Sequence, residues 1–293
     1  MLCNSVRRLR TPALAAGVAM ALASPGTVSA QSTTTLKVLD WNIHHGTDTG
    51  GANNLDRVAT WIAQVNAQVV SLNEVEKQNG YNGNADEPAV LESLLESRTG
   101  VAWYGCFAQR TGSTTGQGNL VLSRIPIDAC ETRLLSGSRS VALARIRFGG
   151  GIVHIASTHL DDASASTRTT EISELKTWLA GKTEARLVLG DFNAGPGATE
   201  TKAMAADYYD SWAQAEAAGT ATAYAGNEAG NTRNSRIDYV WRSKGAAALN
   251  LLGAQVYDTG TTSDHRPVSA TFGVGITAAP SPMLPPTNVR IIR

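Results

Sequence analysis

The chain has 293 residues, of which 25 are Lys or Arg and 25 are Asp or Glu, so its formal net charge is zero. Only 17% of the residues are charged, below the roughly 25% of an average domain. This balance excludes a protein held to nucleic acid by bulk positive charge, although a local basic patch stays open.

The start of the chain has the three parts of a secretory signal peptide. Arg7, Arg8 and Arg10 precede an apolar stretch at residues 13–23, and Val-Ser-Ala at residues 28–30 provides a small-residue cleavage site. The apolar stretch is too short to span a bilayer, and no later segment has a transmembrane pattern. Removing the leader leaves 22 basic against 25 acidic residues, a net charge of −3. We therefore expect a secreted or periplasmic soluble protein.

Short strands and helices then alternate over a length that is feasible for one core of two sheets. In chain order we expect a strand at 36–41, a helix at 55–65, a strand at 68–72, a helix at 88–97, strands at 103–109, 119–123 and 129–135, a strand pair at 141–148 and 152–157, a helix at 168–179, a strand at 187–191, and closing strands at 237–241 and 268–272. Asn53 and Asn54 precede the first helix and can cap its start. The strands at 103–109, 119–123 and 129–135 are expected to be antiparallel neighbours.

Two cysteines remain after the leader, and both lie in that group of three strands. Cys106 and Cys130 flank a predicted hairpin, and export places them in an oxidising compartment. A disulfide between neighbouring strands and two buried free thiols both stay open. No histidine motif accompanies either cysteine, which argues against a catalytic role.

The chain divides into three parts on these patterns. Residues 1–30 form the predicted signal peptide, residues 31–275 the predicted catalytic domain, and residues 276–293 a Pro-rich linker or tail.

The segment at residues 187–193 carries the first chemical signal. An apolar run ends in Gly190, and a carboxylate and an amide follow at Asp191 and Asn193. On a strand these two side chains would project to the same side, because side chains alternate with period two. Gly190 would allow a close approach of the backbone. An ordinary Asx turn explains the pair equally well when it is considered alone.

Polar side chains also follow most of the other predicted strands. Gathered at one edge, they would offer oxygen ligands to a hard cation, with histidines beside it. Mg²⁺ suits such a site, with Mn²⁺ or Ca²⁺ as alternatives, because it needs few protein carboxylates and accepts phosphate oxygens. These residues are Asn42, Glu74, Thr158, His159, Asp191, Asn193, Asp238, Asp264 and His265.

Short motifs around these residues occur in an order that resembles the endonuclease/exonuclease/phosphatase superfamily, with its deoxyribonuclease, abasic-site endonuclease, sphingomyelinase and inositol-phosphate phosphatase branches. The resemblance runs over residues 36–272, and the motifs lie at 39–46, 71–75, 118–124, 157–161, 190–193, 235–239 and 263–265. The resemblance implies an α/β (α+β) four-layer sandwich, in which two mostly antiparallel sheets pack face to face with helices outside.

The same resemblance implies a role for each matched residue. Glu74 looks like the principal metal carboxylate, with Asn42 beside it and Asp264 completing the metal side. His265 resembles the histidine that activates water or stabilises the transferring phosphoryl group. Asp238 would orient that imidazole and raise its basicity.

Three further residues match the side of the family site that holds water and phosphate. Asp191 and Asn193 would hold the nucleophilic water and a phosphate oxygen. His159 matches a histidine of the deoxyribonuclease and sphingomyelinase branches. Where the abasic-site branch tends to have a second metal aspartate, this chain has His44, which we interpret as a structural histidine rather than a ligand, and His45 is a weaker candidate still.

Phosphate contacts are expected from the borders of the polar loop at residues 111–118. Arg110, Asn119 and Arg124 are the candidates, because arginine forks bind phosphate well. Ordinary surface arginines explain Arg110 and Arg124 nearly as well.

The resemblance therefore implies a metal-dependent phosphoric ester hydrolase, with a deoxyribonuclease-like phosphodiesterase as the leading interpretation. A sphingomyelinase-type phospholipase and a small-molecule phosphomonoesterase are the alternatives. Because the loop at residues 111–118 is polar, we see no hydrophobic hairpin for membrane contact. A non-catalytic scaffold on the same fold is the remaining possibility. The expected partner is a phosphate-ester substrate, with no stable protein partner and a monomeric state.

Overall fold

The structure, a computed structural model, describes residues 33–182 and 185–275. The predicted signal peptide at 1–30 and the Pro-rich segment at 276–293 lie outside the described residues. No helix of the described ranges is long and apolar enough to cross a membrane.

Two sheets form the centre of the fold. The first has the order β10 (Ala221–Thr222), β12 (Leu249–Val256), β13 (Val268–Gly275), β1 (Thr33–Asn42), β2 (Val69–Lys77), β4 (Gly116–Ser123) and β3 (Tyr104–Gln109). The second has the order β5 (Ile127–Leu135), β6 (Arg139–Phe148), β7 (Gly151–His159), β8 (Ala185–Asp191), β11 (Asp238–Ser243) and β9 (Tyr208–Asp210). Among the described strand pairs only β1–β2, β7–β8 and β10–β12 are parallel. The sheets are mixed and mostly antiparallel, as predicted.

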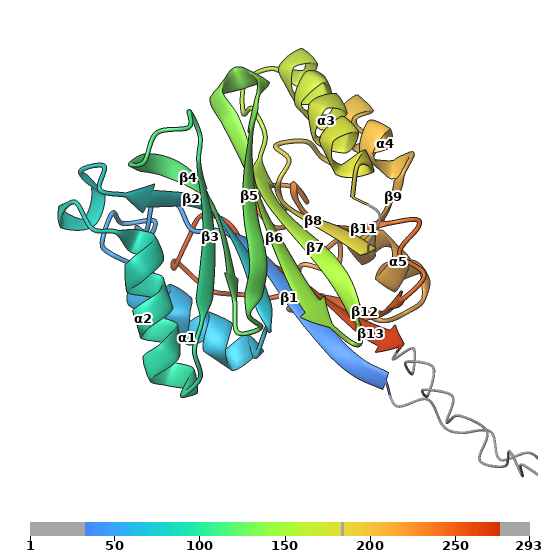
Figure 1. Cartoon of the computed structure of the whole chain (residues 1–293), viewed down its shortest axis with the longest axis horizontal. Helices are drawn as coiled ribbons and strands as arrows, with labels where there is room; N and C mark the ends of the chain where they lie inside the picture. Colours follow the sequence, from blue (N-terminus) through green and yellow to red (C-terminus); the bar gives the residue numbers. More distant parts are fainter. Residues whose placement is uncertain (1–32, 183–184, 276–293) are drawn as a thin grey trace, which may run out of the picture. The chain divides into compact units, whose positions relative to one another are not determined.

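Helices cover the outer faces of both sheets (Figure 1). On the first sheet, α1 (Leu55–Val65) and α2 (Glu87–Thr99) share a hydrophobic core with β1, β2 and β4. On the second, α3 (Ala165–Ala180) and α4 (Thr199–Ala205) share another with β7, β8 and β11. A short helix, α5 (Ser211–Ala217), contributes Trp212 to the core between the sheets. The predicted four-layer sandwich is therefore confirmed.

Side-chain alternation along β1 explains how one strand serves two cores. Leu36 and Val38 lie in the core between the sheets, whereas Leu39 and Trp41 lie in the core under α1 and α2. A strand buried on both faces reads as a nearly continuous apolar run, which is why the segment is recognisable in the sequence.

The strands expected at 103–109, 119–123 and 129–135 are not all neighbours in one sheet, so that prediction was wrong. β3 and β4 pair as expected, but β5 belongs to the other sheet and pairs with β6. Cys106 of β3 and Cys130 of β5 do form a disulfide, with their Cα atoms 5.5 Å apart. The bond therefore joins the edge strands of the two sheets rather than two neighbours within one sheet.

Three smaller expectations also need correction. β2 does not end at Glu74 but continues to Lys77 beyond an irregularity between Leu72 and Val75. Strand β12 and the elements between residues 199 and 222 were not predicted. At the start of α1, Asn53 Oδ1 accepts the backbone N–H of Leu55 at 3.1 Å, whereas the side chain of Asn54 bonds to backbone carbonyls of two loops instead of capping the helix.

Candidate active site

The site lies where the core between the two sheets turns from apolar to polar. Along β1, Leu36 and Val38 face this core, and the next residues on that face are Asp40 and Asn42. The same change occurs on β8, where Asp191 follows Leu187 and Leu189 by period two. The residues that make this end of the inter-sheet layer polar are Asp40, Asn42, Ser71, Asn73, Asn119, Ser140, Ser157, His159, Asp191 and Asp238.

Hydrogen bonds across the layer join several of these buried polar groups. Ser71 Oγ lies 2.7 Å from Ser157 Oγ of the opposite sheet. Asn73 donates from Nδ2 to Thr158 O at 2.9 Å, and its Oδ1 accepts the backbone N–H of Asp191 at 3.1 Å. Because a buried polar group is costly unless it is bonded, this network fixes the register of the two sheets at the site.

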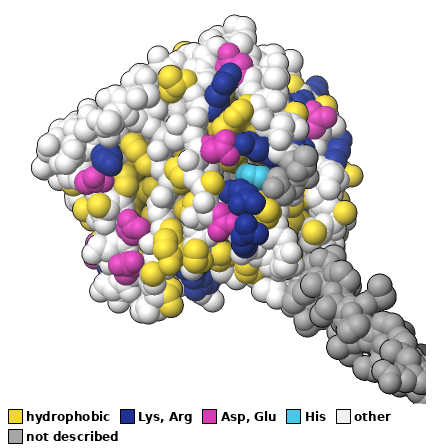
Figure 2. Space-filling model, viewed as in Figure 1, with side chains coloured by type: hydrophobic (Ala, Val, Ile, Leu, Met, Phe, Trp, Pro, Cys, Tyr) yellow, Lys and Arg dark blue, Asp and Glu magenta, His cyan; other side chains and the backbone are white. Residues whose placement is uncertain are grey.

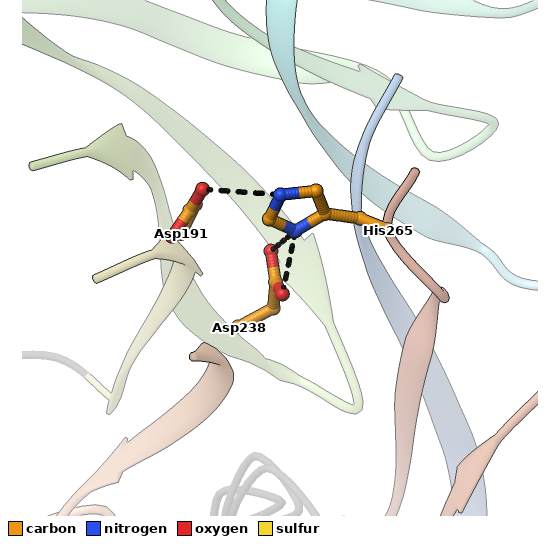
Figure 3. A group of neighbouring side chains, drawn as sticks. All are labelled: Asp191, Asp238 and His265. Atoms are coloured by element: carbon orange, nitrogen blue, oxygen red, sulfur yellow. Dashed lines mark hydrogen bonds and ion pairs between the residues drawn. The ribbon is translucent and has the colours of Figure 1, made fainter. Parts of the chain in front are cut away.

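The centre of the site is the buried group of Asp191, Asp238 and His265 (Figure 3). His265 Nδ1 lies 2.9 and 3.1 Å from the two carboxylate oxygens of Asp238, and its Nε2 lies 3.8 Å from Asp191 Oδ2. Burial alone would lower the pKa of His265, but Asp238 and then Asp191 outweigh it and raise the pKa to about 10. The imidazole is therefore a cation at neutral pH.

Antiparallel pairing brings these three residues together from distant positions in the chain. Asp191 ends β8, whereas Asp238 begins β11, which is paired with β8 so that the two aspartates face one another in register. His265 precedes β13, the antiparallel neighbour of β1. The expectation that these side chains lie at or just beyond the C-terminal ends of strands was therefore wrong for Asp238, the first residue of β11, and for His265, which precedes β13.

The Asp191–Asn193 pair forms the Asx turn that was one interpretation of it. Asp191 Oδ1 accepts the backbone N–H of Asn193 at 2.8 Å, which is an Asx turn. Its Oδ2 remains directed at the site, 3.2 Å from Asn42 Nδ2 and 3.5 Å from His159 Nε2. Burial and then the charge of Asp238 raise the pKa of Asp191 to about 7.

Asn193 does not lie on the strand, contrary to the prediction. It follows the end of β8 with φ +47°, and from there its Nδ2 lies 3.0 Å from His159 Nε2 and donates to Leu160 O at 3.1 Å. An amide N–H beside Nε2 makes that nitrogen the acceptor, so His159 is neutral with Nε2 unprotonated. Burial and then Arg139 hold the pKa of His159 well below its usual value.

Glu74 stands at the irregularity of β2, with φ +56°. Its Oε1 accepts from Asn42 Nδ2 at 2.9 Å, and its Oε2 lies 3.1 Å from His45 Nε2. Asn42 Oδ1 accepts the backbone N–H of His44 at 3.0 Å, which assigns the amide orientation. Asn42 thus presents its amino group to two carboxylates, so it orients Glu74 and Asp191 instead of offering an oxygen.

This arrangement fits a divalent cation. The carboxylates of Glu74 and Asp191 converge on one neutral amide group, which leaves negative charge that a hard cation would balance. Asp264 lines the same cavity, but its Oδ2 is 2.6 Å from the guanidinium of Arg233. Asp191, Asp238 and His265 also lie close enough together to hold an ion, with ligand atoms within 4.8 Å, although both oxygens of Asp238 already contact His265.

A cavity of about 500 Å³ opens over these groups. Its lining includes Arg110, Arg139 and Arg233, so basic side chains surround the acidic centre. Arg139 is only 6% exposed, and its Nε has no hydrogen-bond partner among the described residues. The sequence analysis missed Arg139, Arg233 and the buried carboxyl of Asp40, because a single charged residue in a strand or loop carries no sign of its burial.

The predicted phosphate contacts divide into two groups. Arg110 lines the cavity and donates from Nη1 to Gln117 Oε1 at 2.9 Å. Asn119 is buried beside it and donates to Ser140 O at 2.9 Å, which joins the sheets. Arg124 follows the other end of β4 and bonds to Asn66 after α1, so the structure does not bring it to the site.

Comparisons with known proteins agree with this geometry. The model of the Endonuclease/Exonuclease/phosphatase family matches residues 41–265. No curated protein matches the chain. Among solved structures, the endonuclease/exonuclease/phosphatase from Beutenbergia cavernae is similar at TM-score 0.67 and 22% identity, over 82% of this chain and 72% of that one.

Two further structures are similar at lower identity. The Bacteroides thetaiotaomicron mannosyl-6-phosphatase has TM-score 0.62 and 16% identity, over 80% of this chain and 98% of that chain. The human Nocturnin catalytic domain with bound sulfate has TM-score 0.62 and 19% identity, over 82% and 93%. At these identities the likeness shows a shared fold.

Proposed function

The chain belongs to the Endonuclease/Exonuclease/phosphatase family, and we propose that it is a secreted, divalent-metal-dependent phosphoric ester hydrolase. Within that class we propose a phosphodiesterase that acts by in-line attack of water on phosphorus. The observation that carries the proposal is the buried imidazole of His265, held by Asp238 and directed at Asp191 beside Glu74.

Each residue of this group has a defined part in the proposed reaction. Asp191 would accept the proton of the attacking water, because its Oδ2 is directed into the site between Asn42 and His159. Asn193 and His159 lie beside Asp191 and would hold the water and a phosphate oxygen. His265 would balance the negative charge that develops on phosphorus.

The acidic residues of the cavity would bind the divalent cation. Asn42 orients the carboxylate of Glu74, and this carboxylate would hold the cation. Asp264 lines the same cavity. When bound, a divalent cation would supply positive charge to the phosphoryl oxygens as a Lewis acid. Mg²⁺ is the proposed ion, with Mn²⁺ and Ca²⁺ as alternatives.

Export is part of the proposal and has two supports. The leader pattern at the start of the chain is that of a signal peptide. The Cys106–Cys130 disulfide is a bond that persists mainly in secreted and periplasmic proteins. Export makes a role in DNA repair implausible.

A small-molecule phosphomonoesterase is the second candidate, and the arginines of the cavity favour it. Arg110 and Arg139 border a site of about 500 Å³, a size that suits a small phosphate ester. The similar Bacteroides protein is named a mannosyl-6-phosphatase. On the face shown in Figure 2, basic and acidic side chains are interspersed. This face therefore offers no extended field of one sign.

A substrate panel tests the proposal. The mature protein is assayed on duplex DNA, RNA, sphingomyelin, phosphoinositides and sugar phosphates, with Mg²⁺ or Mn²⁺ and with chelator. We expect cleavage of at least one class that chelator abolishes and the ion restores. Absence of metal-dependent cleavage of every class would contradict the proposal and favour a scaffold on this fold.

A further inference from the structure

We propose that His45 is a nitrogen ligand of the divalent cation and that the buried carboxylate of Glu76 holds it in the coordinating tautomer. The inference rests on the proposed metal-dependent function, and it adds to that function a ligand to which the family resemblance assigned no metal role. It also reverses the order of the two histidines expected from the sequence, in which His44 was the stronger candidate.

The ring of His45 lies between two carboxylates. Its Nε2 is 3.1 Å from Oε2 of Glu74, and its Nδ1 is 2.7 Å from Oε1 of Glu76. The ring stacks on Tyr81, with centroids 4.8 Å apart and planes 12° from parallel. Contacts at both nitrogens and on one face therefore fix the orientation of the imidazole.

Glu76 is a firmly held partner for Nδ1. It is 1% exposed, its Oε2 accepts from Asn79 Nδ2 at 2.7 Å, and its backbone N–H donates to Glu87 Oε2 at 2.8 Å. Gln117 Nε2 lies 3.1 Å from the same Nδ1, but the carboxylate is the closer and the charged acceptor. The Nδ1 proton therefore points at Glu76, which leaves Nε2 as the ligand atom. A carboxylate behind a histidine is the usual support of a metal-binding imidazole.

The separation of Nε2 and Glu74 Oε2 is suited to one ion. Two ligands at about 2.1 Å from an ion, in adjacent octahedral positions, lie about 3.0 Å apart, and the structure places these two atoms 3.1 Å apart. The other oxygen of Glu74 is occupied by Asn42. Glu74 thus offers one oxygen toward His45.

The backbone at residues 44–46 is left-handed, and hydrogen bonds from neighbouring side chains hold it in that conformation. His44, His45 and Gly46 have φ values of +52°, +55° and +65°. Asn82 Nδ2 donates to Gly46 O at 2.9 Å, and Asn54 Nδ2 donates to Thr47 O at 2.8 Å. Such left-handed backbone is costly and persists only where the surroundings hold it. Here it turns the ring of His45 back over β2.

His44 provides the matched comparison. Its Nδ1 lies 3.3 Å from Thr47 O, and no carboxylate contacts its ring in the described residues. It shares the cavity and the backbone conformation of His45 but lacks the Glu76 support. Because imidazole is a softer ligand than carboxylate, His45 would also favour Mn²⁺ over Mg²⁺ and Ca²⁺.

Pulsed electron paramagnetic resonance of the Mn²⁺-loaded protein, labelled with ¹⁵N-histidine, tests the proposal. We expect a coupling from a directly bound histidine nitrogen in the wild type and in His44→Asn, and its loss in His45→Asn. Asparagine tolerates positive φ, so both variants keep the backbone conformation. We also expect Mn²⁺ affinity to fall by about 10-fold or more in His45→Asn, because loss of a ligand should cost at least as much as loss of a residue that supports one.

Other results would overturn the inference in distinguishable ways. Mn²⁺ binding without a nitrogen coupling in the wild type would make His45 a charged bridge between Glu74 and Glu76. A coupling that survives in His45→Asn would assign the ligand to His44, His159 or His265, and its loss in His44→Asn would identify His44. Neither result touches the proposed hydrolase function, whereas absence of both Mn²⁺ binding and metal-dependent cleavage would contradict the two proposals together.

Discussion

His265 and Asp238 are joined by two short contacts, with Nδ1 at 2.9 and 3.1 Å from the carboxylate oxygens. Both residues are nearly inaccessible to water, so the carboxylate acts on the imidazole with little screening. This contact keeps the ring protonated and directs its Nε2 toward Asp191. The orientation of the proposed catalytic histidine therefore depends on Asp238, and its charge depends first on Asp238 and then on Asp191.

Asp238→Asn tests that dependence. An amide is isosteric but uncharged, so the pKa of His265 should fall from about 10 toward its ordinary 6.5. We expect kcat to fall by ~100-fold or more at neutral pH. The alkaline limb of the kcat–pH profile should also move to lower pH, because the imidazole now loses its proton earlier. A variant with kcat within about threefold of wild type and an unmoved alkaline limb would show that the charge is not required.

Gly190 permits the close approach of β8 and β7 at the site. A Cβ at this position would lie 1.8 Å from the carbonyl oxygen of Thr158, and φ is +153°. We expect Gly190→Ala to lose more than ~3 kcal/mol of unfolding free energy or to fail to fold. Gly181→Ala is the control, because φ is −72° there and the nearest atom would be 3.6 Å away. Equal denaturation midpoints for the two variants would contradict this account.

The Cys106–Cys130 disulfide closes a loop across the edges of both sheets, with a sequence separation of 24. We expect replacement of both cysteines by alanine to lower the free energy of unfolding by about 3 kcal/mol, measured by urea denaturation. Reduction of the wild-type protein should produce a similar loss and leave the double variant unaffected. A reductant effect on the double variant would mean that another group responds to it.

Glu87 links stability to pH. Burial raises its pKa from 4.5 to about 7. The folded protein thus holds the proton more tightly than the unfolded chain does, so this contribution is fully present below pH 4.5 and is lost as pH rises to about 7. Glu87→Gln removes the titration. Its stability relative to wild type should rise between pH 4 and pH 8 by on the order of 3 kcal/mol.

Urea denaturation at both pH values, in chelator, measures this difference. Glu216→Gln is the matched control, because Glu216 is exposed on α5 and should show the same stability difference at both pH values. A stability difference between Glu87→Gln and wild type that does not change with pH would mean that Glu87 is ionised in the folded protein.

Much of the fold follows from local patterns. The apolar runs of β1, β2, β7 and β8 are buried on both faces, so their sequences show strands directly. The polar residues that follow them mark one end of the layer between the sheets. Ordered motifs then connect these residues to a family, and the family supplies the four-layer architecture.

What the sequence could not show depends on distant contacts. The local sequence does not show whether β5 pairs with β6 or joins the sheet of β3 and β4. The packing of the two sheets decides to which of them β5 belongs. The contacts of His45 could not be predicted for a similar reason. Three consecutive residues with positive φ turn His45 onto Glu74, and that turn depends on Asn54 and Asn82.

The most direct test of the central claim is the turnover of His265→Ala on a phosphodiester that the wild-type protein cleaves with Mg²⁺ or Mn²⁺. Circular dichroism and the denaturation midpoint serve as the control for folding. We predict that the folded variant loses at least ~100-fold in kcat and that chelator abolishes wild-type turnover. A folded His265→Ala protein with wild-type, metal-dependent turnover would contradict the assignment of this site as the catalytic centre.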